Sequence, residues 1–216
     1  NTEDNKTVND NPNDAKAISL GTQVYDTVAT ELEQRWYAFS VAKATKFTAA
    51  MVMDDTADFD LYVYKLNETD GTLELVGGSA IVGAGTQELS MLKLDEGIYF
   101  IGIEAATGNG SFLMYTYAGV NDGKEINDTT DLASSYVRNS RMTATIDSPF
   151  DYDYYKVVIS KNDILEYTFD QPTGCDYKVL VYDGKNYYTI NNGTYRLNTG
   201  TYYFIVMASS MTNIME

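Results

Sequence analysis

The chain contains 216 residues, with 31 acidic and 15 basic side chains, a formal net charge of −16, no histidine and one cysteine, Cys175. Without histidine it offers no Ser-His-Asp or Cys-His nucleophile pair and no His-ligated zinc site, and a single cysteine forms no internal disulfide. An acidic chain without a basic stripe is repelled by nucleic acid phosphates and anionic lipid heads, and no apolar run reaches the ~20 residues that span a bilayer. We therefore expect neither a nucleic acid partner nor a membrane span.

The N-terminal stretch predicts a polar segment without a core of its own. Residues 1–14 include one large apolar side chain, Val8, which buries too little surface to offset the entropy of ordering. We expect residues 1–8 to form a flexible tail. The chain opens on Asn1 without an initiator methionine, which is compatible with removal of a signal peptide and favours a secreted or cell-surface location.

After this segment, apolar side chains alternate with polar ones at a period of two. The alternating runs are short, rich in Tyr, Val, Ile and Thr, and separated by turn pairs such as Asp70-Gly71 and Asn192-Gly193. Such a pattern is typical of an all-β sandwich or barrel. Only residues 14–20 could hold a helical turn. The alternation predicts six side chains that face the cores: Tyr37, Phe39, Val41, Tyr155, Val157 and Ile159.

The chain also repeats itself, with four landmarks recurring in the same order. This predicts a tandem duplication, with copy one over residues 9–119 and copy two over residues 120–216. The paired landmarks are Asn13-Asp14 with Asn127-Asp128, Trp36-Tyr37 with Tyr154-Tyr155, Asp58-x-x-x-Tyr62-Val63-Tyr64 with Asp176-x-x-x-Leu180-Val181-Tyr182, and Gly97-x-Tyr99-Phe100 with Gly200-x-Tyr202-Tyr203.

Each copy resembles the bacterial pre-peptidase C-terminal domain, whose motifs are an opening Asn-Asp, a D-x-D-W-Y-x-F strand, a D-x-D-L-Y-x-Y strand and a late G-x-Y strand. Copy one carries Asp58-Phe59-Asp60-Leu61-Tyr62-Val63-Tyr64, and copy two carries Asp151-Tyr152-Asp153-Tyr154-Tyr155. The resemblance implies two tandem antiparallel jelly-roll-like β-sandwich domains, similar to the collagen-binding domains of secreted bacterial collagenases. It also implies a non-catalytic accessory module on a secreted or cell-surface bacterial protein.

Copy two departs from copy one at its end. Residues 111–117 of copy one alternate as a final strand, whereas residues 208–216 of copy two show no matching pattern. A missing strand would leave an open sheet edge that invites pairing with another chain, and a truncated chain is the alternative explanation. The oligomeric state stays open.

A calcium site in copy two is the sharpest candidate for a functional site. The resemblance implies it, because calcium-binding relatives combine acids around the opening Asn-Asp with the D-x-D pair. Ca²⁺ takes six to eight oxygen ligands, and its role here would be structural. The alternative is that these side chains are solvated turn and strand-edge residues. Copy one offers a poorer site, because Arg35 stands in place of an acid and could pair with Asp14. The candidate metal ligands are Glu125, Asn127, Asp128, Asp151 and Asp153.

The 19 tyrosines are the other anomaly of composition, and many of them lie in copy two. An exposed tyrosine row stacks on sugars or packs on a protein partner, whereas strand propensity and core filling explain the same residues without a ligand. We expect a secreted or cell-surface, non-catalytic accessory module for adhesion, stabilisation or substrate attachment, with an extracellular protein or polysaccharide as partner. A carbohydrate-binding module that uses exposed tyrosines is the alternative, and an enzyme of an unrecognised kind is a third hypothesis.

Overall fold

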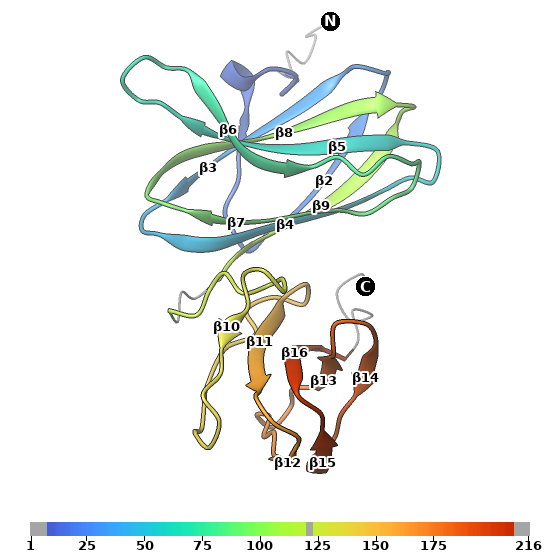
Figure 1. Ribbon diagram of the computed structural model, residues 1–216. Helices are drawn as coiled ribbons and strands as arrows, with labels where there is room; N and C mark the ends of the chain where they lie inside the picture. Colours follow the sequence, from blue (N-terminus) through green and yellow to red (C-terminus); the bar gives the residue numbers. More distant parts are fainter. Residues whose placement is uncertain (1–7, 120–122, 210–216) are drawn as a thin grey trace, which may run out of the picture. The chain divides into compact units, whose positions relative to one another are not determined.

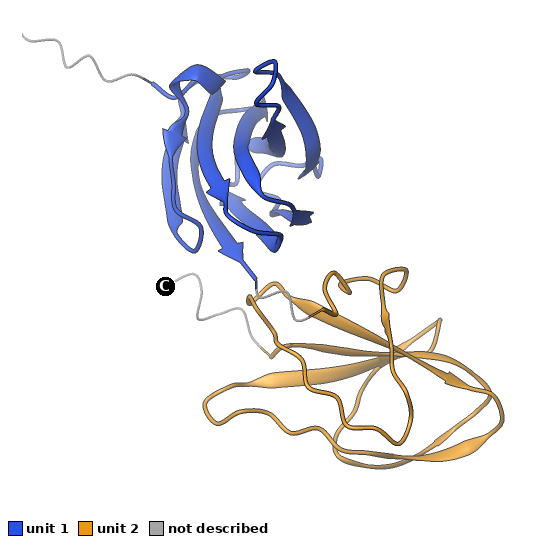
Figure 2. Ribbon diagram, turned by 90° about the vertical axis from the view of Figure 1, so that its left-hand side faces the viewer, with its two compact units in different colours: residues 1–119 blue, residues 120–216 orange. Residues whose placement is uncertain are grey.

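A computed structural model describes residues 8–119 and 123–209, and almost all regular structure in them is β-strand. This confirms the predicted all-β fold class. The helical content of the described residues is one 3-10 turn, Pro12–Asp14, and none of their helices has the length and apolar character needed to cross a membrane. Of the expected tail, residues 1–7 lie outside the described residues, and Val8 is exposed. The chain divides into unit 1, residues 1–119, and unit 2, residues 120–216 (Figure 2).

The larger sheet of unit 1 has five strands. Its order is β1 (Lys16–Ala17), β3 (Gln34–Val41), β8 (Gly97–Thr107), β5 (Asp58–Leu66) and β6 (Leu73–Ser79). The short β1 runs parallel to β3, and every other pair in this sheet is antiparallel. Successive side chains of β3 therefore point alternately to the core and to the outer face of the sheet.

A four-stranded antiparallel sheet packs against it, as Figure 1 shows. Its order is β2 (Gln23–Val28), β9 (Gly110–Ala118), β4 (Thr45–Met53) and β7 (Glu88–Leu94). Side chains from both sheets form one core, in which the Phe39 ring stacks on Phe47 at 5.0 Å and on Tyr99 at 5.6 Å between ring centroids. The predicted core positions Tyr37, Phe39 and Val41 are buried, which confirms the alternation.

Unit 2 repeats the five-stranded sheet strand for strand. Its order is β10 (Ser134–Ser135), β11 (Tyr152–Ile159), β16 (Gly200–Ala208), β13 (Tyr177–Tyr182) and β14 (Tyr187–Thr189), with β10 again parallel to β11. The second sheet consists of β12 (Asp163–Tyr167) and β15 (Gly193–Leu197). The predicted inward side chains Tyr155, Val157 and Ile159 are buried, so the alternation is confirmed here as well.

The two units differ in their second sheets. Strands β12 and β15 correspond in order to β4 and β7, while residues 123–209 contain no counterpart of β2 or β9. The predicted difference at the end of copy two falls mostly on residues 210–216, which lie outside the described residues. Among the described residues the core of unit 1 contains nineteen buried apolar side chains and that of unit 2 contains seven. Unit 2 therefore has less buried apolar surface to hold it together.

The structure corrects one landmark of the repeat. The backbone N–H of Tyr154 donates to the carbonyl of Asn127 at 2.8 Å, and the N–H of Trp36 donates in the same way to Asn9 at 2.7 Å. Asn9, and not Asn13, is therefore the counterpart of Asn127. The wrong pairing arose because Asn-Asp occurs twice in this segment, at residues 9–10 and 13–14.

Candidate metal centre

The candidate site of unit 2 lies where three segments meet. Glu125 and Asn127 belong to the segment that precedes β10, Asp147 lies on the loop before β11, and Asp151 comes immediately before that strand. Asp153 is on β11 and shares its inward face with Tyr155. A hydrogen bond from the Tyr154 N–H to the Asn127 carbonyl ties the opening segment to β11. The segment and the strand therefore position the acids jointly.

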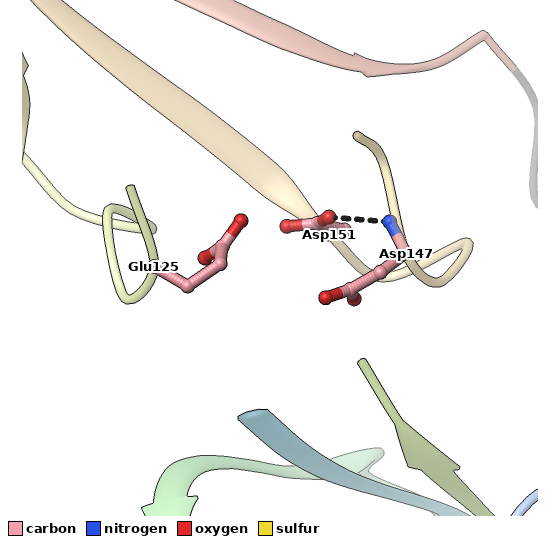
Figure 3. A group of neighbouring side chains, drawn as sticks. All are labelled: Glu125, Asp147 and Asp151. Carbon is pink, nitrogen blue, oxygen red and sulfur yellow. Dashed lines mark hydrogen bonds between the residues drawn. The ribbon is translucent and has the colours of Figure 1, made fainter. Parts of the chain in front are cut away.

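Three carboxylates converge in this region. Glu125, Asp147 and Asp151 each place one carboxylate oxygen within 4.8 Å of the other two (Figure 3). The turn that ends at Asp151 is closed by its own side chain, since the Asp147 N–H donates to Asp151 Oδ2 at 2.7 Å. Like charges at this separation repel one another, and a divalent cation between them removes that repulsion. Asp147 was not among the ligands predicted from the sequence.

Asn127 connects this group to Asp153. Asn127 is wholly buried, and with its amide nitrogen turned towards the carboxylates it donates to Asp153 Oδ1 and Glu125 Oε2, both at 3.1 Å. Half a turn of the amide directs its carbonyl oxygen at the same place. With its nitrogen towards the carboxylates, the amide donates hydrogen bonds to them. With its oxygen towards them, it offers a ligand to a cation bound between them. Asp153 is held by a second contact, because the Tyr155 hydroxyl donates to its Oδ2 at 2.7 Å.

Asp128 is a buried residue of the same opening segment. Its charge raises the pKa of Tyr154, after the larger effects of burial and of Tyr187 and Tyr152. Tyr154 alternates with Asp153 and therefore faces the other side of the sheet. Of the five ligands predicted from the sequence, the structure brings together Glu125, Asn127, Asp151 and Asp153, the last through Asn127.

The matching place in unit 1 carries a positive charge. Arg35, at the position of Asp153, forms ion pairs with Glu33 at 2.8 Å and with Asp26 at 3.8 Å. The Tyr37 hydroxyl donates to the same Asp26 at 2.7 Å. The expected pairing of Arg35 with Asp14 was wrong, because Asp14 accepts from the Asn11 side chain at 2.7 Å and strand β2 supplies Asp26 instead.

Arg35 and Asp26 also shift the pKa values of the groups that they contact. Burial raises the pKa of Glu33, but the hydrogen bonds from Arg35 and from the Ala29 and Thr30 N–H groups outweigh it, so the pKa lies below its ordinary value. Burial and the bond to Asp26 raise the pKa of Tyr37. A guanidinium thus occupies in unit 1 the place where unit 2 gathers carboxylates.

Comparison with known proteins shows only distant likeness. No protein family model and no curated protein sequence matches the chain. Among solved structures, the pre-peptidase C-terminal domain of a Bacillus anthracis collagenase is 16% identical with a TM-score of 0.41, and the alignment covers 47% of this chain and 93% of that one. GEBA250068378 from Sulfurospirillum deleyianum is 10% identical, with a TM-score of 0.32 and coverage of 45% and 97%. The CUB1-EGF-CUB2 domains of rat MASP-1 are 10% identical, with a TM-score of 0.31 and coverage of 90% and 94%.

Likenesses this distant transfer no ligand and no activity to this chain. The alignment with the pre-peptidase C-terminal domain covers about half of this chain, and a tandem of such domains stays a prediction.

Proposed function

We propose that the chain is a non-catalytic binding module of a secreted or cell-surface protein, in which a calcium ion stabilises unit 2. The observation that carries the proposal is the convergence of the Glu125, Asp147 and Asp151 carboxylates, together with the wholly buried Asn127 side chain that lies 3.1 Å from Glu125 Oε2. Calcium accepts carboxylate and amide oxygens in flexible geometry, and weak sites of extracellular modules fill at the calcium concentrations outside cells.

The ion would act as a tie between segments. Glu125 and Asn127 come from the opening of unit 2, Asp147 from the following loop, and Asp151 and Asp153 from the start of β11. On binding, Asn127 would turn its carbonyl oxygen to the ion, and main-chain carbonyls or water would complete the shell. Asp128, which is buried in the same opening segment, would add a further carboxylate to the site. The small apolar core of unit 2 gives such a tie a clear stabilising role.

Calorimetry of the intact chain tests the metal. After removal of residual metal, addition of calcium should raise the melting temperature of unit 2, since ligand at a hundredfold excess over its dissociation constant stabilises the folded state by about 2.7 kcal/mol. Asp151→Asn with Asp153→Asn should abolish the shift, and Asp147→Asn alone should weaken calcium binding in a direct titration. Glu33→Gln in unit 1 is the matched control and should leave the calcium response unchanged.

A melting curve that is indifferent both to calcium and to chelator, from protein verified as metal-free, would rule the site out. The carboxylates would then be turn residues whose charges are tolerated by hydrogen bonding.

The absence of catalysis is proposed on chemical grounds. The chain has no histidine to activate a serine or its one cysteine. The converging carboxylates are assigned to a structural ion. Turnover by purified protein that is lost on a single Asp or Glu substitution would overturn this part of the proposal.

A second candidate function, carbohydrate binding, is favoured by the outer face of the unit 2 sheet. The Tyr182 ring stacks on Tyr187 at 4.5 Å and lies 6.2 Å from Tyr203. Tyr187 is 57% exposed. Aligned aromatic rings at a surface stack on the apolar faces of sugar rings.

Affinity electrophoresis through gels that contain polysaccharide tests this alternative. Sugar binding predicts retardation of the chain, and Tyr187→Ala should remove it. Tyr25→Ala is the matched control, because Tyr25 is an exposed tyrosine of unit 1 outside this aromatic row. Equal mobility of all three proteins in every gel would exclude the alternative.

A further inference from the structure

Strand β12 of unit 2 has a strand partner on one side only. Its counterpart in unit 1, β4, pairs with β7 on one edge and with β9 on the other. Among the described residues, β12 pairs with β15 and with no other strand (Figure 1). The edge that β9 covers in unit 1 is therefore free of strand pairing in the described part of unit 2.

The two strands correspond residue by residue. Thr45, the first residue of β4, pairs with the last residue of β7, and Asp163, the first residue of β12, pairs with the last residue of β15. Ile164 therefore takes the place of Lys46. In unit 1 the Gly119 N–H, just after β9, donates to the Lys46 carbonyl at 2.7 Å, so the polar backbone groups of Lys46 face β9.

In unit 2 the same backbone groups face an edge that no described strand covers. The N–H and C=O groups of alternate residues point to the same side of an antiparallel strand, so those of Ile164 and Glu166 point away from β15. The Ile164 N–H donates instead to the neighbouring Asp163 Oδ1 at 2.8 Å. An added strand would give these groups the backbone partners that β9 gives to β4.

The apolar face of β12 is also less covered than that of β4. The three core positions of β4 are wholly buried in unit 1. Their counterparts in unit 2, Leu165, Tyr167 and Phe169, are only partly buried against the core. In unit 1, β9 supplies the cover, because Met114 lies opposite Met51 and is wholly buried. A segment that enters beside β12 would therefore bury apolar surface as well as pair the backbone.

The segment that stands in place of β2 does not pair with β12 as a strand. Residues 136–151 contain no strand, and their described contacts with β12 and the residues after it include two ion pairs. Arg138 pairs with Asp163 at 3.1 Å, and Arg141 pairs with Asp170 at 3.6 Å. The side chains of both pairs are one-third exposed or more, and exposed ion pairs stabilise little. An entering strand would displace them at small cost.

A single extended segment fits this edge better than a second copy of the chain. In unit 1, β9 and β2 lie over β3, since the Tyr37 ring lies edge-on to Phe112 and its hydroxyl donates to Asp26. The corresponding place beside β12 therefore lies over β11. A second copy paired through its own β12 would bring a further five-stranded sheet to that side, where β11 of the first copy already lies. The net charge of −16 also repels a second copy.

We propose that the free edge of β12 binds an extended segment of a partner protein, antiparallel to β12 and with apolar side chains at alternate positions. Strand β9 defines this chemistry, because its inward residues Phe112 and Met114 are buried while its backbone pairs with β4. When a strand adds to a sheet edge, backbone hydrogen bonds give affinity and alternate side chains give specificity. The site adds a protein-binding surface to the binding module proposed above, and it contains none of the proposed calcium ligands.

A peptide with the sequence of β9, residues 110–118, tests the proposal on the intact chain. We expect the fluorescein-labelled peptide to bind saturably, as measured by fluorescence anisotropy with calcium in excess. The free edge pairs with the peptide backbone, so the position of each peptide N–H decides its effect.

N-methylation of chosen peptide bonds separates edge pairing from simple apolar adsorption. In unit 1 the Thr116 N–H donates to Thr22 on the β2 side, so the N–H groups of Met114 and Thr116 point away from β4 and those of Tyr115 and Tyr117 point towards it. A peptide methylated at Tyr115 and Tyr117 should therefore bind about tenfold or more weakly than the matched control, which is methylated at Met114 and Thr116.

Proline variants of the chain supply the second arm. Glu166→Pro removes an N–H that points to the free edge, while the bonds to β15 use the alternate residues of β12. This variant should weaken peptide binding about tenfold or more. Thr194→Pro is the matched control, because Thr194 lies opposite Glu166 and its N–H points to the outer edge of β15. The control should bind the peptide as the parent chain does.

Amide hydrogen exchange of the parent chain, followed by NMR, addresses the other occupants of the edge. The Glu166 N–H should exchange fast in the free chain and slow down when the peptide binds. Slow exchange without peptide would show that residues of this chain or of a second copy already pair with the edge, and it would overturn the proposal.

Three further results would overturn it. They are the lack of saturable binding, equal affinities of the two N-methylated peptides, and equal losses in the two proline variants. If Glu166→Pro fails to fold, the comparison of the two peptides on the parent chain still decides. None of these results changes the calcium dependence of the melting temperature, so this proposal and the metal site can fail separately.

Discussion

Equivalent positions on β3 and β11 carry opposite charges, and this single difference changes what the surrounding residues can do. Arg35 neutralises Glu33 and Asp26 in unit 1. Asp153, at the same position in unit 2, joins a group of oxygen side chains through Asn127. In unit 1 the Arg35 guanidinium neutralises the neighbouring acids. In unit 2 the corresponding side chains are acidic, and a bound cation would be needed to neutralise them.

Replacing Arg35 by Met should therefore destabilise unit 1. The variant leaves Glu33 and Asp26 without their shared counter-charge, and since both acids are about one-quarter exposed we expect a loss of about 1–3 kcal/mol in the free energy of unfolding. Urea denaturation measures the loss. Arg35→Lys is the control, because it keeps the charge and should lose less.

The pH dependence of this loss has a definite sign. The pKa of Glu33 is held below its ordinary value of 4.5, so the ion pair contributes stability above pH 4.5 and loses it as the pH falls through the lowered pKa. The difference between Arg35→Met and the parent chain should therefore shrink in acid. A difference that stays constant from pH 7 down to full protonation of Glu33 would show that Arg35 acts through packing alone.

At the scale of strands, the sequence was sufficient to predict which side chains face the core wherever apolar residues recur at every second position. Alternation identified Tyr37, Phe39 and Val41 as core residues, and all three are buried. It could not reveal which strands become neighbours, because hydrogen-bonded order depends on contacts between residues far apart in the chain. The order of the five-stranded sheet, shared by both units, is a finding of the structure.

Asp147 shows why one member of the candidate metal centre was missed by the sequence analysis. In unit 1 the stretch between β1 and β3 contains β2, which supplies Asp26 to Arg35. In unit 2 the corresponding residues, 136–151, form no strand, and their loop supplies Asp147 instead. A motif comparison between the copies has nothing to align at such a position, so only the folded chain brings Asp147 to Glu125 and Asp151.

The stack of Phe39 between Phe47 and Tyr99 gives a prediction at the same scale. Phe39→Ala should lower the free energy of unfolding of unit 1 by about 3–5 kcal/mol, because it removes a buried ring and leaves a cavity between two aromatic neighbours. Ile98→Ala, at a 39% exposed position of β8, is the control and should change stability far less. A loss well below 1 kcal/mol for Phe39→Ala would contradict the assigned core.

For the whole molecule, unequal cores predict unequal stability. Each unit has its own core, and unit 1 buries nineteen apolar side chains among its described residues against seven in unit 2. Hydrophobic stabilisation scales with buried apolar area, so the two units should not unfold together. We expect two transitions in a calorimetric scan of the intact chain, and we assign the lower one to unit 2.

Core variants identify the transitions independently of any metal. Phe39→Ala should lower the upper transition, and Val157→Ala, which truncates a buried side chain of β11, should lower the lower transition. Calcium should then move only the transition that Val157→Ala moves, because its proposed ligands all belong to unit 2. A single transition shifted by both core variants would show that the units unfold as one cooperative body, and that the deficit in the core of unit 2 is made up elsewhere in the molecule.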